Sequence, residues 1–397
     1  MKKNSFPFLS VAVLSVIALV SCGGTANNAK PLIFFNRQPS DPTTSAVDMD
    51  TMNFSDKTYY VGFDAAAGGD VQGKMITDYL KTKTKAELDN NGDGTLGYVL
   101  CIGDAAHNDS KARTLGIRKA LGTAKDDSTA ADVKQDGSVT VKDGTLVVKE
   151  LAAKVMTGAD GSTWNADAAK DATTAWVSKL GTEIDMFVSN NDGMAEGCLS
   201  NPSFPNVPIF GYDANADAVA DIGTGKMTGT VSQNVDAQAA GTLQMIRNIC
   251  DGLTGEDVYK KGFTENDQYG NKISASMEYI SSTKAVLASN TAVTAANYTN
   301  YTSGSRDTGI AQLTSSAKTL KVWIDLYNAS DNFLSSSYKP ALEYYAGKMN
   351  INLSFTLGDG SSENSVSDYF VNLDNFDAFA VNMVKTNSGS LYTGKII

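Results

Sequence analysis

Short apolar runs alternate along this chain with segments of helical periodicity, and this alternation predicts an α/β fold. The first run, residues 31–36, has no polar alternation, which is typical of a parallel strand buried on both faces. Further strands are predicted at 59–62, 98–102, 185–189, 208–213, 229–234, 320–324, 351–356 and 376–383, with an extended segment at 273–282. Helices are predicted at 69–81, 112–121, 166–180, 238–251 and 334–348, and a hairpin at 138–149. Strands that alternate with helices form doubly wound parallel sheets, and the number of strands indicates two such sheets.

Polar residues recur where the predicted strands stop. The loop 103–114 contains His107, the only histidine of the chain, followed by Asp109 and Arg113. Asp109 is placed to cap the next helix, and Arg113, four residues on, shares its face. Ligands of open α/β sheets bind at the carboxyl ends of the strands. We therefore expect one cleft lined by Asn36, His107, Asp109, Arg113, Asn191, Asp213, Gln233 and Asp331.

These side chains suit a ligand rich in hydroxyl groups, because a hydroxyl both donates and accepts hydrogen bonds. Trp164 and Phe333 stand in loops beside the polar positions, where aromatic rings can cover the C–H faces of a pyranose. Simpler interpretations stay open: Asp109 only caps a helix, His107 is an ordinary loop residue and Arg113 is solvated. Either aromatic residue can equally belong to the core.

Composition excludes several classes of function. The 397 residues suffice for two domains, and the net charge of −11 argues against nucleic-acid binding because phosphates would be repelled. A single histidine argues against a zinc cluster and against catalysis based on histidine.

The N-terminus has the parts of an export signal. Lys2 and Lys3 precede an apolar run over 8–20, which ends in Leu19–Val20–Ser21–Cys22. That ending resembles a bacterial lipobox, which implies a signal peptide over 1–21, lipidation of Cys22 and a tether over 22–30. The alternative is an ordinary signal peptide with a chance cysteine. No other segment approaches the ~20 apolar residues that span a bilayer, so we expect an exported protein anchored to a bacterial membrane.

Three cysteines remain after Cys22. Cys101 lies in a predicted core strand and is expected to be a buried thiol. Spacing does not decide whether Cys198 and Cys250 pair.

Four stretches resemble the periplasmic galactose/glucose-binding proteins of ABC transporters: 31–39, 103–114, 188–195 and 208–213. The resemblance covers about 30–290 in order, whereas 319–397 resembles the segment that normally comes first, with Asp331–Asn332–Phe333 as the opening sugar-binding loop. It implies the two-lobed type I periplasmic binding protein fold, α/β, with a doubly wound parallel sheet in each lobe, circularly permuted through a linker at 291–318. The rival interpretation is an appended third domain after residue 318, which would leave the first lobe with an exposed sheet edge.

The resemblance also implies boundaries for the two lobes. The first lobe takes residues 31–59, 234–275 and 319–397, and the second takes 60–233 and 276–290. Three crossings, near Tyr60, Gln233 and Ser276, act as hinges that close over the ligand.

The family's function is binding, not catalysis. The resemblance implies a monomer that binds D-glucose or D-galactose through the polar residues above, with Trp164 and Phe333 on either face of the ring. Gln233 stands where the family usually has asparagine, and Asp331 is the candidate to discriminate the two sugars. An ABC permease is the implied partner, and a chemoreceptor is a possible second one.

An acidic loop has the spacing of the first half of an EF-hand, with Asp89, Asn91 and Asp93 at alternate positions. The twelfth position is Leu100, which excludes a true EF-hand. The resemblance implies a calcium site made by these three residues, the carbonyl of Thr95 and, from a distant strand, Asp185. Gly97 stands where the family offers a side-chain amide.

Two other functions remain to be separated from sugar capture. A glycosidase would use Asp213 and Asp331 as paired carboxyl groups. A lipoprotein sensor for a nucleoside or an autoinducer-type sugar would share only the fold.

Overall fold

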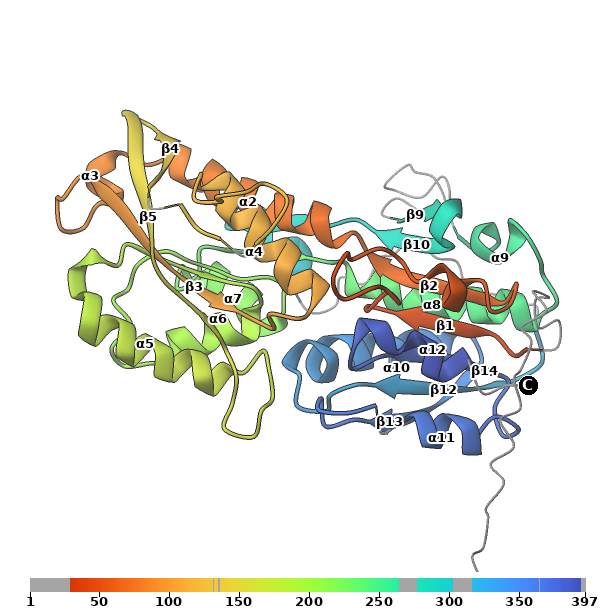
Figure 1. Ribbon diagram of the computed structural model, residues 1–397. Helices are drawn as coiled ribbons and strands as arrows, with labels where there is room; N and C mark the ends of the chain where they lie inside the picture. Colours follow the sequence, from red (N-terminus) through yellow and green to blue (C-terminus); the bar gives the residue numbers. More distant parts are fainter. Residues whose placement is uncertain are drawn as a thin grey trace, which may run out of the picture.

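Two α/β lobes lie side by side in the computed structural model (Figure 1). The structure describes residues 29–130, 132–134, 136–263, 277–302, 316–363 and 365–393. The expected signal peptide and Cys22 lie outside these ranges, as do 273–276 and much of the expected linker. Within the described ranges, the helices are all too short or too polar to cross a bilayer.

The first lobe is built on a seven-stranded sheet with the spatial order β13-β12-β14-β1-β2-β10-β9. All neighbours are parallel except β9, which pairs antiparallel with β10 at one edge. The strands are β1 (Leu32–Phe35), β2 (Thr58–Phe63), β9 (Met277–Ile280), β10 (Ala285–Ala288), β12 (Leu320–Leu326), β13 (Ile351–Leu357) and β14 (Ala378–Asn382). Every residue of β1 and β2 is buried, as expected for central parallel strands.

Helices cover both faces of this sheet. One face packs against α8 (Val235–Cys250) and α10 (Lys339–Lys348), which a π-helical turn, Leu334–Tyr338, precedes. The other face packs against α1 (Met49–Met52), α11 (Ser365–Val371) and α12 (Gly389–Thr393). The short α9 (Asp257–Lys260) follows α8.

The second lobe is built on another seven-stranded sheet, with the order β11-β8-β7-β6-β3-β5-β4. Its centre is parallel, and β4 and β11 are antiparallel edge strands. The strands are β3 (Thr95–Ile102), β4 (Gly137–Val141), β5 (Gly144–Val155), β6 (Met186–Ser189), β7 (Ile209–Phe210), β8 (Gly229–Ser232) and β11 (Thr291–Thr294).

Helices again cover two faces. One face packs against α2 (Ala65–Lys81) and α4 (Asn108–Ala120), and the other against α5 (Ala166–Leu180), α6 (Asp192–Leu199) and α7 (Ala216–Thr224). The remaining short elements are α3 (Lys85–Leu88) and the 3-10 turns Gly181–Glu183, Ser281–Thr283, Tyr298–Tyr301 and Thr386–Ser388.

The predicted class, α/β with two sheets, is confirmed. The C-terminal strands β12, β13 and β14 enter the same sheet as β1, and β14 pairs directly with β1. An appended third domain after residue 318 is therefore wrong, because these strands form part of the first lobe's own core.

Three expected boundaries differ from the structure. Residues 58–61 of β2 pair with β1 and residues 60–63 pair with β10, both in the first sheet, so the chain leaves the first lobe after Phe63 rather than near Tyr60. Segment 277–288 belongs to the first sheet and not to the second lobe, because β10 pairs with β2. The start of the expected linker is the edge strand β11, so the third crossing is at 289–290 rather than near Ser276. The local sequence pattern does not show which sheet these segments join, because a short edge strand has the same hydrophobic pattern in either sheet.

Candidate functional site

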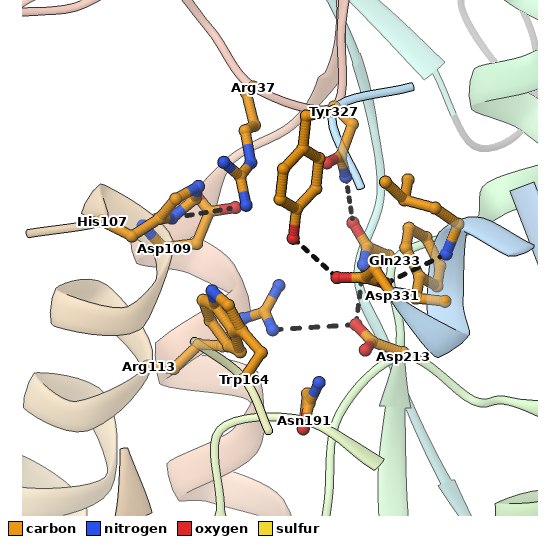
Figure 2. Close-up of a pocket in the computed structure, with 13 residues that line it drawn as sticks. Arg37, His107, Asp109, Arg113, Trp164, Asn191, Asp213, Gln233, Tyr327 and Asp331 are labelled. Atoms are coloured by element: carbon orange, nitrogen blue, oxygen red, sulfur yellow. Dashed lines mark hydrogen bonds and ion pairs between the residues drawn. The ribbon is translucent and has the colours of Figure 1, made fainter. Parts of the chain in front are cut away.

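A pocket between the two lobes gathers all ten residues that the sequence predicted to bind a ligand (Figure 2). Three further residues, Arg37, Tyr327 and Leu334, complete its lining. The ten are Asn36, His107, Asp109, Arg113, Trp164, Asn191, Asp213, Gln233, Asp331 and Phe333. Whether they bind a ligand stays a prediction, but their convergence is a fact of the fold.

The topology explains the convergence. Asn36 directly follows β1, and Gln233 directly follows β8. Asn191, which caps α6, comes two residues after β6. Parallel strands end at the same edge of a sheet, and residues that follow strands of both sheets line one pocket, so the strand-end side chains meet between the lobes.

Three of these residues adopt backbone conformations that non-glycine residues rarely use. The φ angles are +59° at Asn36, +60° at Trp164 and +119° at Asp213. Such strain persists where surrounding structure enforces it, and it gathers at functional sites. At Trp164 the constraint is visible, because a Cβ atom added to Gly103 would lie 2.2 Å from the indole ring.

His107, and not Asp109, caps α4, which corrects the expected role of Asp109. The helix begins at Asn108, and Nδ1 of His107 accepts a hydrogen bond of 3.1 Å from the backbone N–H of Asp109. The carboxylate of Asp109 is thereby left to the pocket, where burial raises its pKa against the opposing effects of Arg113 and Arg37.

Burial and the same hydrogen bond together decide the protonation of the imidazole ring of His107. Burial, together with the positive charges of Arg37, Arg113 and Lys111, lowers the pKa of His107 well below its usual value. The ring is therefore neutral, and since Nδ1 accepts, Nε2 carries the proton. Nε2 is buried and has no hydrogen-bond partner among the residues that the structure describes.

Arg113 is held flat beside the pocket. Its guanidinium lies 3.6 Å from the ring centre of Tyr212 and donates a 2.8 Å hydrogen bond to the carbonyl of Asn190. Nη1 is also 3.7 Å from Oδ1 of Asp213. Its Nε, like Nε1 of Trp164, is buried without a partner in the described part of the chain. With Nε2 of His107, the pocket lining thus contains three unpaired buried donors, and unpaired buried donors call for an acceptor from outside the protein.

Gln233 links the two lobes. Its Nε2 donates to Oδ1 of Asp213 at 2.8 Å, and its Oε1 accepts from Nδ2 of Asn36 at 3.3 Å. The extra methylene relative to asparagine lets one side chain reach both partners. Burial raises the pKa of Asp213 well above its usual value, Asp192 and Asp331 raise it further, and Arg113 opposes them.

Asp331 is already engaged by the protein. Its Oδ2 accepts a 2.6 Å hydrogen bond from the hydroxyl of Tyr327, and its Oδ1 accepts one of 3.1 Å from the backbone N–H of Leu334. These bonds orient the carboxylate and leave its remaining lone pairs as acceptors.

Arg37 and Tyr327 were missed by the sequence reasoning. The Arg37 guanidinium lies 3.5 Å above the centre of the Tyr327 ring, and its Nη1 donates to the carbonyls of Met383, at 3.2 Å, and Val384. Arg37 lies two residues after the end of β1, and Tyr327 directly follows β12. Both residues would have been found if every polar residue just after a predicted strand had been counted as a candidate for the cleft.

The acidic loop is closed by backbone hydrogen bonds. Asp89 accepts from the N–H groups of Gly92, Asp93 and Gly94 at 2.7–3.1 Å. Asp185 reaches the loop from just before β6 and accepts from Asn90 and Gly97, each at 2.8 Å.

The donor types of this loop suit a hard cation such as calcium. Burial, followed by the charges of Asp89 and Asp93, raises the pKa of Asp185 to about 6. A bound cation would reduce the repulsion between these negative charges. However, no group of three His, Cys, Asp or Glu side chains in the described part of the chain is arranged to hold a metal ion. Calcium binding stays a prediction.

A family model described as periplasmic binding protein domain matches residues 26–254, and a second model of the same description matches 319–389. The D-galactose/methyl-galactoside binding periplasmic protein MglB of Haemophilus influenzae is 30% identical over 234 residues, which are 57% of this chain and 59% of that protein. A putative rhizopine-binding protein of Rhizobium meliloti is 25% identical over 56% of this chain and 58% of that protein.

The chain therefore spans just under three fifths of the length of these curated relatives. Among solved structures, an ABC transporter solute binding protein from Bacillus halodurans with bound myo-inositol is 17% identical, with a TM-score of 0.43 and coverage of 68% of both chains.

Proposed function

This chain belongs to the periplasmic binding protein domain family, and from that membership we propose that it is a receptor that captures D-glucose or D-galactose between its lobes for an ABC importer. The observation that carries the proposal is that the pocket lining combines unpaired donors, Nε2 of His107, Nε of Arg113 and Nε1 of Trp164, with the carboxyl groups of aspartate residues. A hexose hydroxyl is an acceptor for the former and a donor to the latter.

Aromatic side chains support a sugar rather than a smaller polar ligand. Trp164 belongs to the second lobe and Phe333 to the first, and both line the pocket. Rings contributed from opposite lobes suit the two apolar faces of a pyranose. The relative from Haemophilus influenzae carries galactose in its name, which favours a hexose.

The strand order supports a circular permutation of the family fold. If β12 is counted as the first strand, the order β13-β12-β14-β1-β2 becomes 2-1-3-4-5, a common doubly wound order. We therefore propose that the first βα units of the fold lie at the C-terminal end of this chain.

Cys22 is proposed to carry a lipid that anchors the protein at a bacterial membrane, on the lipobox-like residues alone. The closed form would present both lobes to the permease, and a chemoreceptor is a second candidate partner. Closure follows from hinges at the three crossings, after β2, before α8 and between β10 and β11.

The test is titration calorimetry of the protein without its lipid, using glucose, galactose, other hexoses, pentoses, inositols and purine nucleosides. We expect one hexose to bind in a 1:1 complex. Asp213→Ala should weaken binding by at least ~2 kcal/mol, about 30-fold in Kd, because it strands hydroxyl partners in a closed site.

Asp171→Ala is the matched control, since it removes an exposed carboxylate from α5 in the same lobe. An Asp213→Ala variant that binds as tightly as the parent would contradict the proposed site. Tighter binding of a nucleoside would favour the sensor, and release of a chromogenic aglycone from a glycoside panel would favour an enzyme.

A further inference from the structure

Two cysteines outside the pocket lie in contact inside the second lobe. The Sγ atoms of Cys101, in β3, and Cys198, in α6, are 3.5 Å apart. Both thiols are free and buried, with 1% and 0% of their surface exposed. Cys250 is in α8 of the other lobe, where its Sγ lies 3.9 Å from the carbonyl of Asp377.

Packing holds the two sulfur atoms in this position. Cys101 points from β3, an inner strand of the sheet, toward the face covered by α5 and α6, and both cysteines belong to the core cluster between that face and those helices. A disulfide needs an S–S distance of about 2.05 Å. The two Sγ atoms must therefore approach each other by about 1.5 Å to form the bond.

We propose that Cys101 and Cys198 form a disulfide bond in the mature protein. The inference rests on the proposed periplasmic location, because disulfides persist in oxidising compartments. The oxidant is a thiol–disulfide exchange protein of that compartment. One cysteine thiolate attacks the oxidant's disulfide, a mixed disulfide forms, and the second thiolate displaces the oxidant. The two cysteines lose two protons and two electrons, and the oxidant's disulfide becomes two thiols.

The burial of both thiols sets the order of events. A folded second lobe shields them from a protein oxidant, so the exchange takes place before α6 packs on β3. The resulting bond would close a loop between residues 97 positions apart and restrict the unfolded chain. It would also tie α6, whose cap Asn191 lines the pocket, to the strand that leads to His107.

Peptide mapping without reductant tests the bond. The full chain is recovered from the cell envelope of a bacterial host, unfolded with iodoacetamide and digested with trypsin. We expect peptides 86–111 and 180–226 to be linked, and peptide 248–260, which holds Cys250, to be alkylated. Alkylation of both Cys101 and Cys198, or a link to Cys250, would overturn the proposal.

Thermal unfolding gives a second readout. Dithiothreitol should lower the Tm of the parent protein by about 5 °C or more, since a loop of this size is strongly constrained. Cys198→Ser should lose this sensitivity, and Cys250→Ser, the matched control, should keep it. An equal response of all three proteins would count against the bond.

Sugar calorimetry on the same preparation separates this inference from the proposed function. Linked peptides without hexose binding would refute only the receptor, and hexose binding without linked peptides would refute only the disulfide.

Discussion

His107 shows how one residue can serve both fold and site. Its Nδ1 caps α4, so the imidazole must be neutral for the helix to begin where it does. The second nitrogen is then committed as a donor at the pocket. The local sequence placed His107 in the right loop, but it favoured Asp109 as the cap, because carboxylates cap helices more often than imidazoles do.

The neutral state of His107 predicts a pH dependence. Its pKa is lowered well below 6.5 in the folded protein, whereas the unfolded chain takes up a proton near pH 6.5. Below that pH the unfolded state binds more protons than the folded state, so His107 makes the free energy of unfolding fall as the pH falls. At a pH of about 5.5 the loss is about 1.4 kcal/mol relative to a pH well above 6.5. We expect Tm to decrease less steeply over pH 7.5 to 5.5 in His107→Gln than in the parent.

Because the chain has a single histidine, its imidazole signal can be assigned to His107 directly. The imidazole signal in a proton NMR titration should not shift between about pH 8 and pH 6. A titration midpoint near 6.5 would contradict the buried, neutral state.

Individual elements depart from the sequence pattern mostly at their ends. A strand was predicted over 208–213, but β7 holds only Ile209 and Phe210. Beyond it, the N–H groups of Gly211 and Asp213 still donate to carbonyls of β8, and Asp213, with a positive φ, lines the pocket. Hydrophobic runs mark buried chain, whether it pairs in a sheet or lines a site, so they overestimate strands that end at functional loops.

The acidic loop before β3 is the element at which calcium binding can be tested. Calcium at about 100 times its Kd should add ~2.7 kcal/mol of stability and raise Tm at pH 7.5. A proton competes for Asp185, whose pKa is about 6, so the rise should shrink as the pH falls below that value. Differential scanning fluorimetry with calcium or a chelator measures both effects.

Variants isolate the loop. Asp185→Asn should abolish the calcium-dependent rise, and Asp126→Asn, which removes a carboxylate from an exposed turn elsewhere in the second lobe, should retain it. If neither calcium nor a chelator changes the Tm of the parent protein, the result would contradict the proposed calcium site.

At the scale of the whole molecule, the C-terminal strands complete the first lobe. Three of the seven strands in that sheet come from residues 320–382, and Trp323 of β12 packs in the same core cluster as Leu32 and Phe34 of β1. Removing them would expose the side of β1 that now pairs with β14.

Rearranging the chain tests the permutation. A variant in which 319–397 precedes residue 29 should fold with an unchanged hexose affinity, since it keeps every strand and its neighbours. A variant that lacks 319–397 is the control and should aggregate. Solubility, circular dichroism and calorimetry measure the outcome, and a stable, sugar-binding deletion variant would contradict this account.

The sequence by itself determined the α/β class, most strands and helices, and the strand-end residues that line the pocket. It could do so because burial imposes a local period, and because turns and caps use a small set of residues. Only the tertiary structure decided which sheet takes β9, β10 and β11, how Gln233 bridges the lobes, and that Cys101 meets Cys198. These features depend on contacts between distant residues, such as the bond from Asn382 to Phe35 across 347 positions, and no local pattern encodes them.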